Sequence, residues 1–159
     1  MISLQLGDVS HIIQLAIAPV FLLTGVGTKL SVLTSRLARI IDRARVVEDL
    51  LQKMPDDNAP INKLGLEYEL NELYERSRLI NRAITLSTSC GLLICLVIAT
   101  LFLGDATSLN LDKLIAALFV GGIFSLIGSF IYFMREILVA TKTLSRQHKH
   151  GKSRALPGE

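Results

Sequence analysis

The sequence lacks the residue combinations on which most enzymes and metalloproteins depend. Its 159 residues include two cysteines, three histidines and no tryptophan. It contains no paired nucleophile and base, no zinc-ligand spacing and no glycine-rich phosphate loop. Cys90 and Cys95 are five residues apart in an apolar segment, so on a helix they point in different directions, and neither a disulfide nor a metal pair is expected. The sequence therefore predicts no enzymatic activity, no metal and no cofactor.

Charged residues are absent from two long segments, residues 83–103 and 114–134. The chain is 50% hydrophobic and 19% charged, with a mean hydropathy of +0.48. A segment of ~20 apolar residues is long enough to cross a bilayer. The first apolar segment lacks the basic start and small-residue cleavage site of a removable signal peptide, so we expect it to remain in the mature protein.

These features predict an all-α membrane protein with three transmembrane helices and a water-exposed module. Lys29 lies near the end of the first span and can snorkel to the headgroups. The tail from about Gln147 has the composition of a disordered end. The expected segments are a lead (1–10), a first span (11–33), a hairpin (34–82), a second span (83–103), a loop (104–112), a third span (113–134) and a basic tail (135–159).

Apolar residues recur at alternating spacings of three and four beyond the first span and before the second. Such spacing keeps one helix face against a partner helix, as in a coiled coil. A turn rich in proline and aspartate, residues 55–60, separates the two arms, and the second helix is expected to start near Asn62. We therefore predict that the first two helices extend into an antiparallel coiled-coil hairpin. Its seam consists of Leu30, Leu33, Leu37, Ile40, Ala44, Val47, Leu51 and Met54 in the first arm and of Leu66, Leu70, Leu73, Ser77, Ile80 and Ile84 in the second.

Basic residues are concentrated in the hairpin segment and the tail, whereas the lead and the loop 104–112 contain none. By the positive-inside rule, the hairpin and the C-terminus are expected to be cytoplasmic and the N-terminus outside. The expected environment is a bilayer with an anionic inner leaflet. Nucleic acid is not expected as a partner. Basic residues that would contact lipid headgroups are Arg76, Arg78, Arg82 and Arg135.

Two polar stripes follow the first helix beside its apolar seam. In one interpretation, a hydroxyl stripe lines a watery path and a basic stripe sets charge preference at its inner mouth. In the other, which we favour, small residues allow close helix packing while the cations contact lipid headgroups. The hydroxyl stripe is Thr24, Thr28, Ser31 and Ser35, and the basic stripe is Lys29, Arg36, Arg39 and Arg43.

Small residues recur at every fourth position in the second and third spans. This spacing lets helix backbones approach in lipid, either within the chain or between copies in a homo-oligomer. The distal hairpin is acidic, and Glu67, Glu69 and Glu72 are candidates for binding a cationic cytoplasmic protein, although a solvated helix face is the more common explanation of such charges. The small-residue stripes are Ser87, Gly91, Cys95 and Ala99, and Ala117, Gly121, Ser125 and Ser129.

Three runs of the sequence resemble a family of bacterial membrane proteins known as domain of unknown function 2721. They are Ile-Ala-Pro-Val-Phe-Leu at 17–22, Leu-Ser-Val-Leu-Thr-Ser-Arg-Leu-Ala-Arg-Ile-Ile-Asp-Arg-Ala-Arg at 30–45, and Arg-Ser-Arg-Leu-Ile at 76–80. The resemblance extends from about Ile12 to Thr141. It implies a bacterial inner-membrane protein with three spans and brings no activity, cofactor or binding residue.

Two functional hypotheses remain. The leading one is a homo-oligomeric channel or pore for a small ion or solute, lined by the hydroxyl stripe, with Lys29 and Arg36 at the inner mouth. The second is a non-conducting scaffold or regulator whose cytoplasmic hairpin binds a protein partner.

Overall fold

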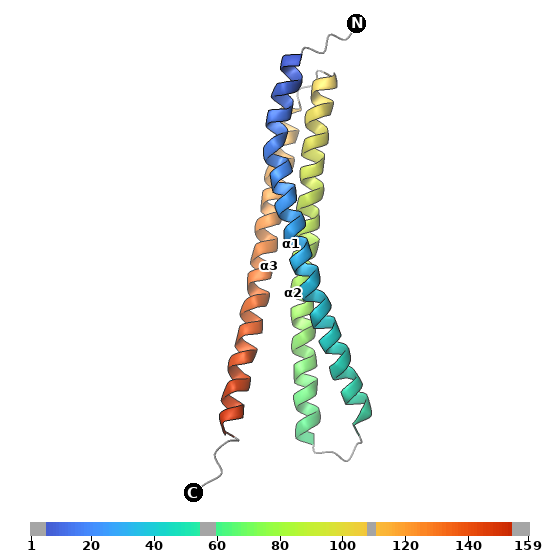
Figure 1. Ribbon diagram of the computed structural model, residues 1–159, viewed down its shortest axis with the longest axis vertical. Coiled ribbons are helices and arrows are strands. Elements are labelled where there is room, and N and C mark those ends of the chain that lie inside the picture. The colour runs from blue at the N-terminus through green and yellow to red at the C-terminus, as the bar shows by residue number, and fades with distance from the viewer. Residues whose placement is uncertain (1–5, 55–59, 108–110, 154–159) are drawn as a thin grey trace. The chain divides into compact units, whose positions relative to one another are not determined.

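The computed structural model describes residues 6–54, 60–107 and 111–153, with side chains described for residues 13–54, 63–104 and 111–141. The described residues form three α-helices, α1 (Leu6–Lys53), α2 (Pro60–Thr107) and α3 (Asp112–Ser153), shown in Figure 1. Within this described part there is no β-strand. The predicted all-α fold with three long apolar helices is confirmed.

Each helix contains a segment long and apolar enough to cross a membrane. These segments lie within Ile13–Lys53, Lys63–Gly104 and Asp112–Thr141. Large apolar side chains cover their outer surface, including Phe21, Leu92 and Phe124, which are 75%, 63% and 70% exposed. Exposing such a surface to lipid carries no free-energy penalty, because acyl chains are as apolar as the side chains. The chain is a multi-pass membrane protein.

Proline sets the facing ends of α1 and α2. Helix α1 ends at Lys53, close before Pro55, because a proline disfavours helical geometry at the residue before it. Helix α2 begins at Pro60, earlier than the start expected near Asn62. The assignment of Pro60 to the turn is therefore wrong, since a proline is tolerated in the first helical turn, where its missing N–H has no partner to lose. The rest of that turn, residues 55–59, lies outside the described residues.

Helix α3 continues past the expected end of its span at Met134 and reaches Ser153. Residues 135–150 contain neither glycine nor proline and are rich in residues with good helix propensity. The expectation of disorder from about Gln147 is therefore wrong for residues 147–153. Residues 154–159 of the tail lie outside the described part.

The three helices together build two compact units, each containing a part of every helix. Unit 1 comprises the described parts of Met1–Thr34 and Ile84–Ser129, and unit 2 those of Ser35–Ala83 and Phe130–Glu159. Unit 1 holds most of each expected span, whereas unit 2 holds the expected hairpin and the start of the basic tail. The division along the chain thus follows the change from charge-free to charged sequence.

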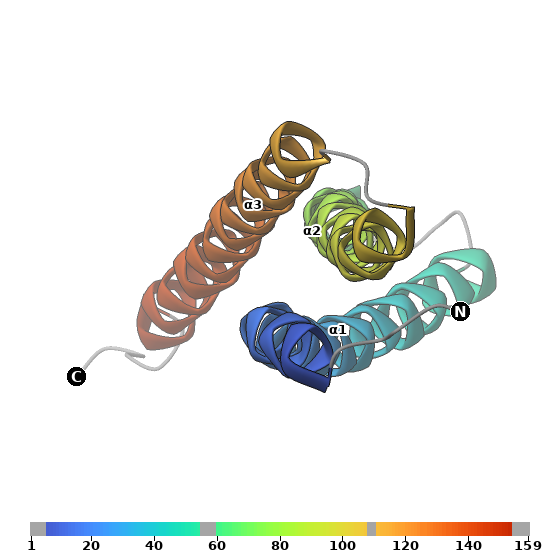
Figure 2. The same cartoon turned by 90° about the horizontal axis from the view of Figure 1, so that it is seen from above.

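In unit 1, α2 packs against both α1 and α3 (Figure 2). Val26 of α1 and Cys90 and Ile94 of α2 form a buried cluster, against which Leu126 of α3 packs. A Cβ atom added at Gly122 would lie 3.2 Å from Ile94 Cδ1. This small residue therefore allows the close helix approach that stabilises packing in lipid.

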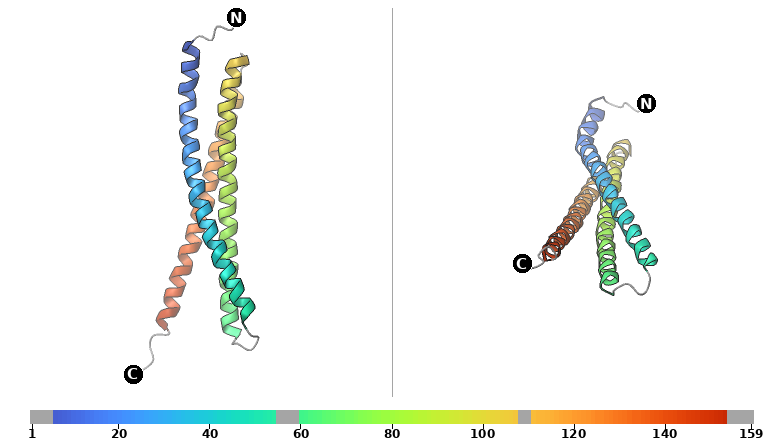
Figure 3. Two further views of the ribbon diagram at one scale, coloured as in Figure 1. Left: turned by 45° about the vertical axis from the view of Figure 1, so that its right-hand side comes forward. Right: turned by 60° about the horizontal axis from the view of Figure 1, so that its bottom comes forward.

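In unit 2, α1 and α2 run antiparallel, as Figure 3 shows. Every residue of the predicted seam in both arms is buried or half-buried, both in this unit and at the three seam positions that belong to unit 1. Ile40, Val47, Leu73 and Ile80 are its most enclosed large side chains in this unit. The coiled-coil character of the pair stays a prediction.

Replacing Gly122 with valine is expected to destabilise unit 1, because the added carbons would meet Ile94. Overpacking of this kind costs about 1–3 kcal/mol. Thermal unfolding of the purified protein in detergent, followed by far-ultraviolet circular dichroism, should show a lower melting temperature. The matched control is Gly27→Val on α1, where an added Cβ meets no atom within 4 Å. Equal losses in the two variants would contradict this account of the packing.

Candidate functional site

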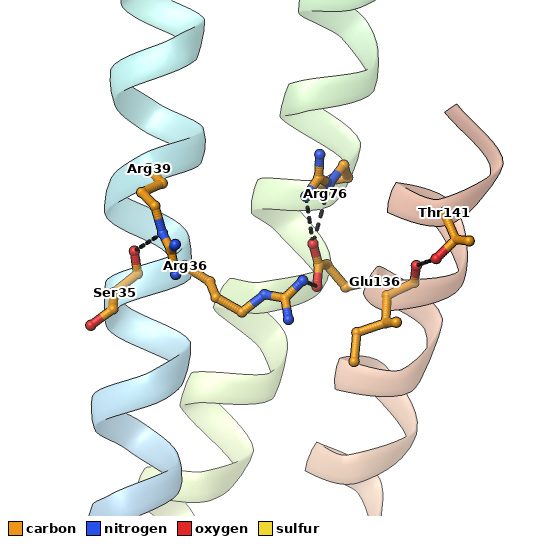
Figure 4. Close-up of polar contacts among 7 residues, drawn as sticks. Ser35, Arg36, Arg39, Arg76, Glu136 and Thr141 are labelled. Carbon is orange, nitrogen blue, oxygen red and sulfur yellow. Dashed lines mark hydrogen bonds and ion pairs between the residues drawn. The ribbon is translucent and has the colours of Figure 1, made fainter. Parts of the chain in front are cut away.

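A buried carboxylate joins all three helices of unit 2. Glu136 of α3 has no exposed side-chain surface. Arg76 of α2 donates to its Oε1 from Nε at 3.2 Å and from Nη2 at 3.0 Å. Arg36 of α1 places Nη2 3.2 Å from Oε2 (Figure 4). We call these three residues the Glu136 cluster.

The two carboxylate oxygens of Glu136 are held differently. Oε1 accepts hydrogen bonds from Arg76, whereas Oε2 receives none from the described residues. The guanidinium of Arg36 still lies within ion-pair distance of Oε2. We regard this contact as a Coulombic attraction, which depends much less on angle than a hydrogen bond does. The positive charges of Arg36 and Arg76 therefore both act on the carboxylate of Glu136.

Aromatic residues preceding Glu136 on α3 place rings under two arginines. The guanidinium carbon of Arg36 lies 5.4 Å from the centre of the Phe133 ring. That of Arg82 lies 5.8 Å from the centre of the Tyr132 ring. Both distances suit a cation–π attraction, which is strongest where water is partly excluded. The part of α3 that lies in unit 2 therefore begins with two aromatic rings that contact cations of α1 and α2.

The chemistry of the Glu136 cluster is that of a structural ion cluster. Removing one partner from a buried ion pair is strongly destabilising, because the remaining charge is left uncompensated in a poorly solvated place. Among the described residues, no three His, Cys, Asp or Glu side chains come together in a way that would hold a metal ion.

Two further polar contacts join α1 and α2 within unit 2. Arg43 donates to Glu69 Oε1 from Nε at 2.8 Å, and its Nη2 lies 2.7 Å from the same oxygen. The Tyr74 hydroxyl donates to Glu48 Oε1. This hydrogen bond, followed by the negative charge of Glu48, raises the pKa of Tyr74 above its ordinary value. Both contacts are exposed, so they contribute specificity of pairing more than stability.

The basic stripe of α1 has a different partner at each position. In unit 1, Lys29 Nζ donates to Ser129 Oγ at 2.8 Å, and this oxygen lies 2.7 Å from Ser87 Oγ. Both serines are fully buried. In unit 2, Arg36 faces Glu136, Arg43 binds Glu69, and the exposed Arg39 donates from Nε to the Ser35 carbonyl at 3.4 Å.

The hydroxyl stripe lies on the outer surface of α1. Thr24 and Thr28 are exposed and donate to the carbonyls of Val20 and Thr24 at 3.2 and 3.1 Å. Ser31 and Ser35 are also exposed. A threonine whose hydroxyl bonds to its own helix can face lipid without an unsatisfied donor. A path along this stripe would require another copy of the chain to enclose it.

Of the other residues that the sequence singled out for headgroup or partner binding, some bind a side chain of the same chain and others are exposed. Arg76, expected at lipid headgroups, binds Glu136, and Glu69, a partner-binding candidate, binds Arg43. Glu72 is half-buried. The exposed candidates are Arg78, Arg82 and Arg135 for headgroups and Glu67 for a partner.

The sequence reasoning missed Glu136. A signal was present, since Glu136 follows Ser129, the last member of a small-residue stripe, by seven residues and so lies on the same face of α3. An acidic residue on the packing face of a helix, where the chain leaves its span, predicts a buried ion pair with a basic residue of a neighbouring helix.

Comparison with known families places the chain in a family of unknown function. The family model described as "Protein of unknown function (DUF2721)" matches residues 16–146. The chain belongs to this family. The matched region includes every residue of the Glu136 cluster. No curated protein and no solved structure matches this DUF2721 chain.

Replacing Glu136 with glutamine is expected to destabilise the protein by about 3 kcal/mol, because Arg36 and Arg76 lose the carboxylate between them. The melting temperature in detergent measures this loss. Glu67→Gln removes one carboxylate from an exposed position of α2 and should change stability by less than about 0.5 kcal/mol. An equal effect of the two variants would refute the structural role of Glu136.

The pKa of Tyr74 is expected to fall towards its ordinary value in Glu48→Gln, because the substitution weakens the hydrogen bond and removes the negative charge that together raise it. The raised pKa means that the stabilisation from this contact is complete below the unfolded-state pKa and is lost as pH rises through the folded-state pKa. Absorbance of tyrosinate, recorded in a Tyr68→Phe, Tyr132→Phe background, isolates Tyr74 among the three tyrosines. An unchanged titration would contradict the contact.

Proposed function

We propose that this protein is a non-conducting membrane scaffold or regulator whose hairpin binds a protein partner through the outer face of α2. The single observation behind this proposal is an exposed apolar surface in the segment expected to stand in water. Leu64 is 70% exposed and Tyr68 is 61% exposed. Both lie in the expected hairpin, outside the apolar span that begins at residue 83.

The two residues belong to one continuous stripe. We define the outer stripe as Leu64, Glu67, Tyr68, Asn71 and Glu75, which are all exposed and follow one face of α2 at helical spacing. Tyr68, Asn71 and Glu75 also line a surface depression together with Glu72, Tyr74 and Arg78. Tyrosine provides large contact area at low entropic cost, which is why it is enriched where proteins bind one another.

The charges of the outer stripe support a basic partner. Glu67 and Glu75 flank the apolar residues of the outer stripe, and the described side chains of the stripe include no cation. A basic amphipathic helix fits this pattern, because its apolar positions would cover Leu64 and Tyr68 while its cations face the glutamates. Glu69 does not take part in this proposal, because Arg43 engages it.

The proposed location is the bacterial inner membrane, with the hairpin and the C-terminus in the cytoplasm. The distribution of lysine and arginine favours this orientation, since the loop 104–112 contains neither. Self-association through the spans belongs to the same proposal. Cys95, Ala99 and Ala117 are exposed members of the small-residue stripes and allow a second copy to approach closely.

The competing channel hypothesis needs the hydroxyl stripe to face a shared axis. Thr24 and Thr28 instead satisfy their hydroxyls on their own helix, as residues facing lipid do. These two hydroxyls therefore need no water-filled path to be satisfied.

A photoreactive residue at position 68 is expected to crosslink a protein with a basic surface in cells, identified by mass spectrometry. Reversing charge with Glu67→Lys and Glu75→Lys should reduce the adduct by about tenfold, since two attractive contacts become repulsive. Asp42→Lys, at an exposed position of α1, is the matched control and should leave the adduct unchanged. Adducts only with further copies of the chain, or adducts insensitive to the reversals, would overturn the partner assignment.

The non-conducting part of the proposal has its own measurement. Purified protein in liposomes is expected to give no more ion flux than empty liposomes. Flux above that background that falls in Thr28→Val would support the channel instead, because the substitution removes a hydroxyl while keeping the side-chain shape.

A further inference from the structure

A groove between α1 and α2 of unit 2 is lined mainly by arginines. Its walls are Arg36, Arg39 and Arg43 of α1 and Arg76 of α2, with Ile40 and Leu73 as the apolar remainder. The three arginines of α1 fall at spacings of three and four, so they share one face of that helix. We call this feature the arginine groove.

The arginine groove carries an excess of positive charge. Three of its four guanidinium groups contact two carboxylates, those of Glu136 and Glu69, and the fourth, that of Arg39, bonds to a backbone carbonyl. The excess is therefore two positive charges. Arginine is effectively always protonated, so this excess persists across the physiological pH range.

Two of the arginines are held in place before any ligand arrives. Glu136 fixes Arg36 and Arg76, whose side chains are 29% and 22% exposed. A fixed side chain loses less conformational entropy on binding than a free one. A guanidinium has five N–H donors, and Arg76 uses only its Nε and one Nη for Glu136. Glu136 therefore orients the remaining N–H donors of the two arginines as well as their positive charges.

The position of the groove in the sequence places it where the chain leaves the membrane. Arg36 follows the first expected span by three residues, and Glu136 follows the third by two. The phosphates of phospholipids occupy this level of a bilayer. Planar, forked arginine side chains bind phosphate oxygens through pairs of N–H groups.

We propose that the arginine groove is a binding site for the phosphate of an anionic phospholipid headgroup. This site is separate from the outer stripe and does not depend on the proposed partner. Arg39 is its most informative member, because it is exposed and its bond is to the Ser35 carbonyl rather than to a carboxylate.

The test uses the full chain in a neutral detergent with short-chain phosphatidylglycerol as the probe and phosphatidylcholine as its zwitterionic counterpart. Native mass spectrometry counts bound lipid. We expect phosphatidylglycerol to bind in preference, and Arg39→Gln to weaken it about fivefold, the loss expected for one cation at an anionic surface. Arg45→Gln, an exposed arginine of α1 outside the groove, is the matched control and should bind as the wild type does.

A second measurement separates the lipid from its phosphate. Phosphatidylglycerol should raise the melting temperature of the wild type and of Arg45→Gln more than that of Arg39→Gln, because a ligand stabilises only the state that binds it. An excess of inorganic phosphate should displace little lipid. Full displacement by inorganic phosphate would assign the groove to a soluble anion and overturn the lipid assignment. Equal lipid binding by Arg39→Gln and wild type, or an equal loss in Arg45→Gln, would overturn the site itself.

Discussion

The side chain of Glu136 constrains unit 2 more tightly than any apolar contact does. A carboxylate withdrawn from water costs several kcal/mol unless opposite charge and hydrogen bonds replace the solvent. Here Arg36 and Arg76 supply both, and they come from two other helices. Apolar packing is non-directional and tolerates small shifts. An ion cluster does not, since one residue of slip moves a side chain by 1.5 Å along the helix axis and rotates it by about 100°. The cluster therefore fixes the register of α1, α2 and the first turns of α3 in this unit.

The two units are stabilised by different interactions because their expected solvents differ. Lipid gives no hydrophobic drive for helices to associate, so unit 1 depends on close approach at Gly122 and on hydrogen bonds among Lys29, Ser129 and Ser87. Water does provide that drive, and in unit 2 the apolar seam through Ile40, Val47, Leu73 and Ile80 uses it. One continuous heptad pattern provides the buried face of α1 in both units, although the expected solvent is lipid in one and water in the other. The polar residues beside it, rather than the seam, mark where the environment changes.

Sequence reasoning succeeded where a property repeats along one helix and failed where it depends on several helices. The seam was predicted residue by residue, because periodicity in a single helix determines which face is buried. The spans followed from length and the absence of charge. The position of Glu136 on a packing face predicts that it is paired, but its partners Arg36 and Arg76 are 100 and 60 residues away in the sequence, and no pattern in a single helix identifies them. The hydroxyl stripe shows what periodicity in one helix does not determine. The spacing places Thr24 and Thr28 on one face, but it does not tell whether that face contacts protein or lipid. Helix ends were also less predictable, as Pro60 and residues 147–153 show.

Phosphate in the arginine groove and the carboxylate of Glu136 can use the same guanidinium groups without excluding each other. Arg36 and Arg76 each have five N–H donors, and the carboxylate occupies only part of that set. A lipid phosphodiester would add one negative charge where two positive charges are in excess, so binding would reduce the excess of the groove without competing with Glu136. The outer stripe lies on a different face of α2 from Arg76, because Tyr68 precedes Arg76 by eight residues, about 80° around the helix. A headgroup and a protein partner can therefore occupy the hairpin together.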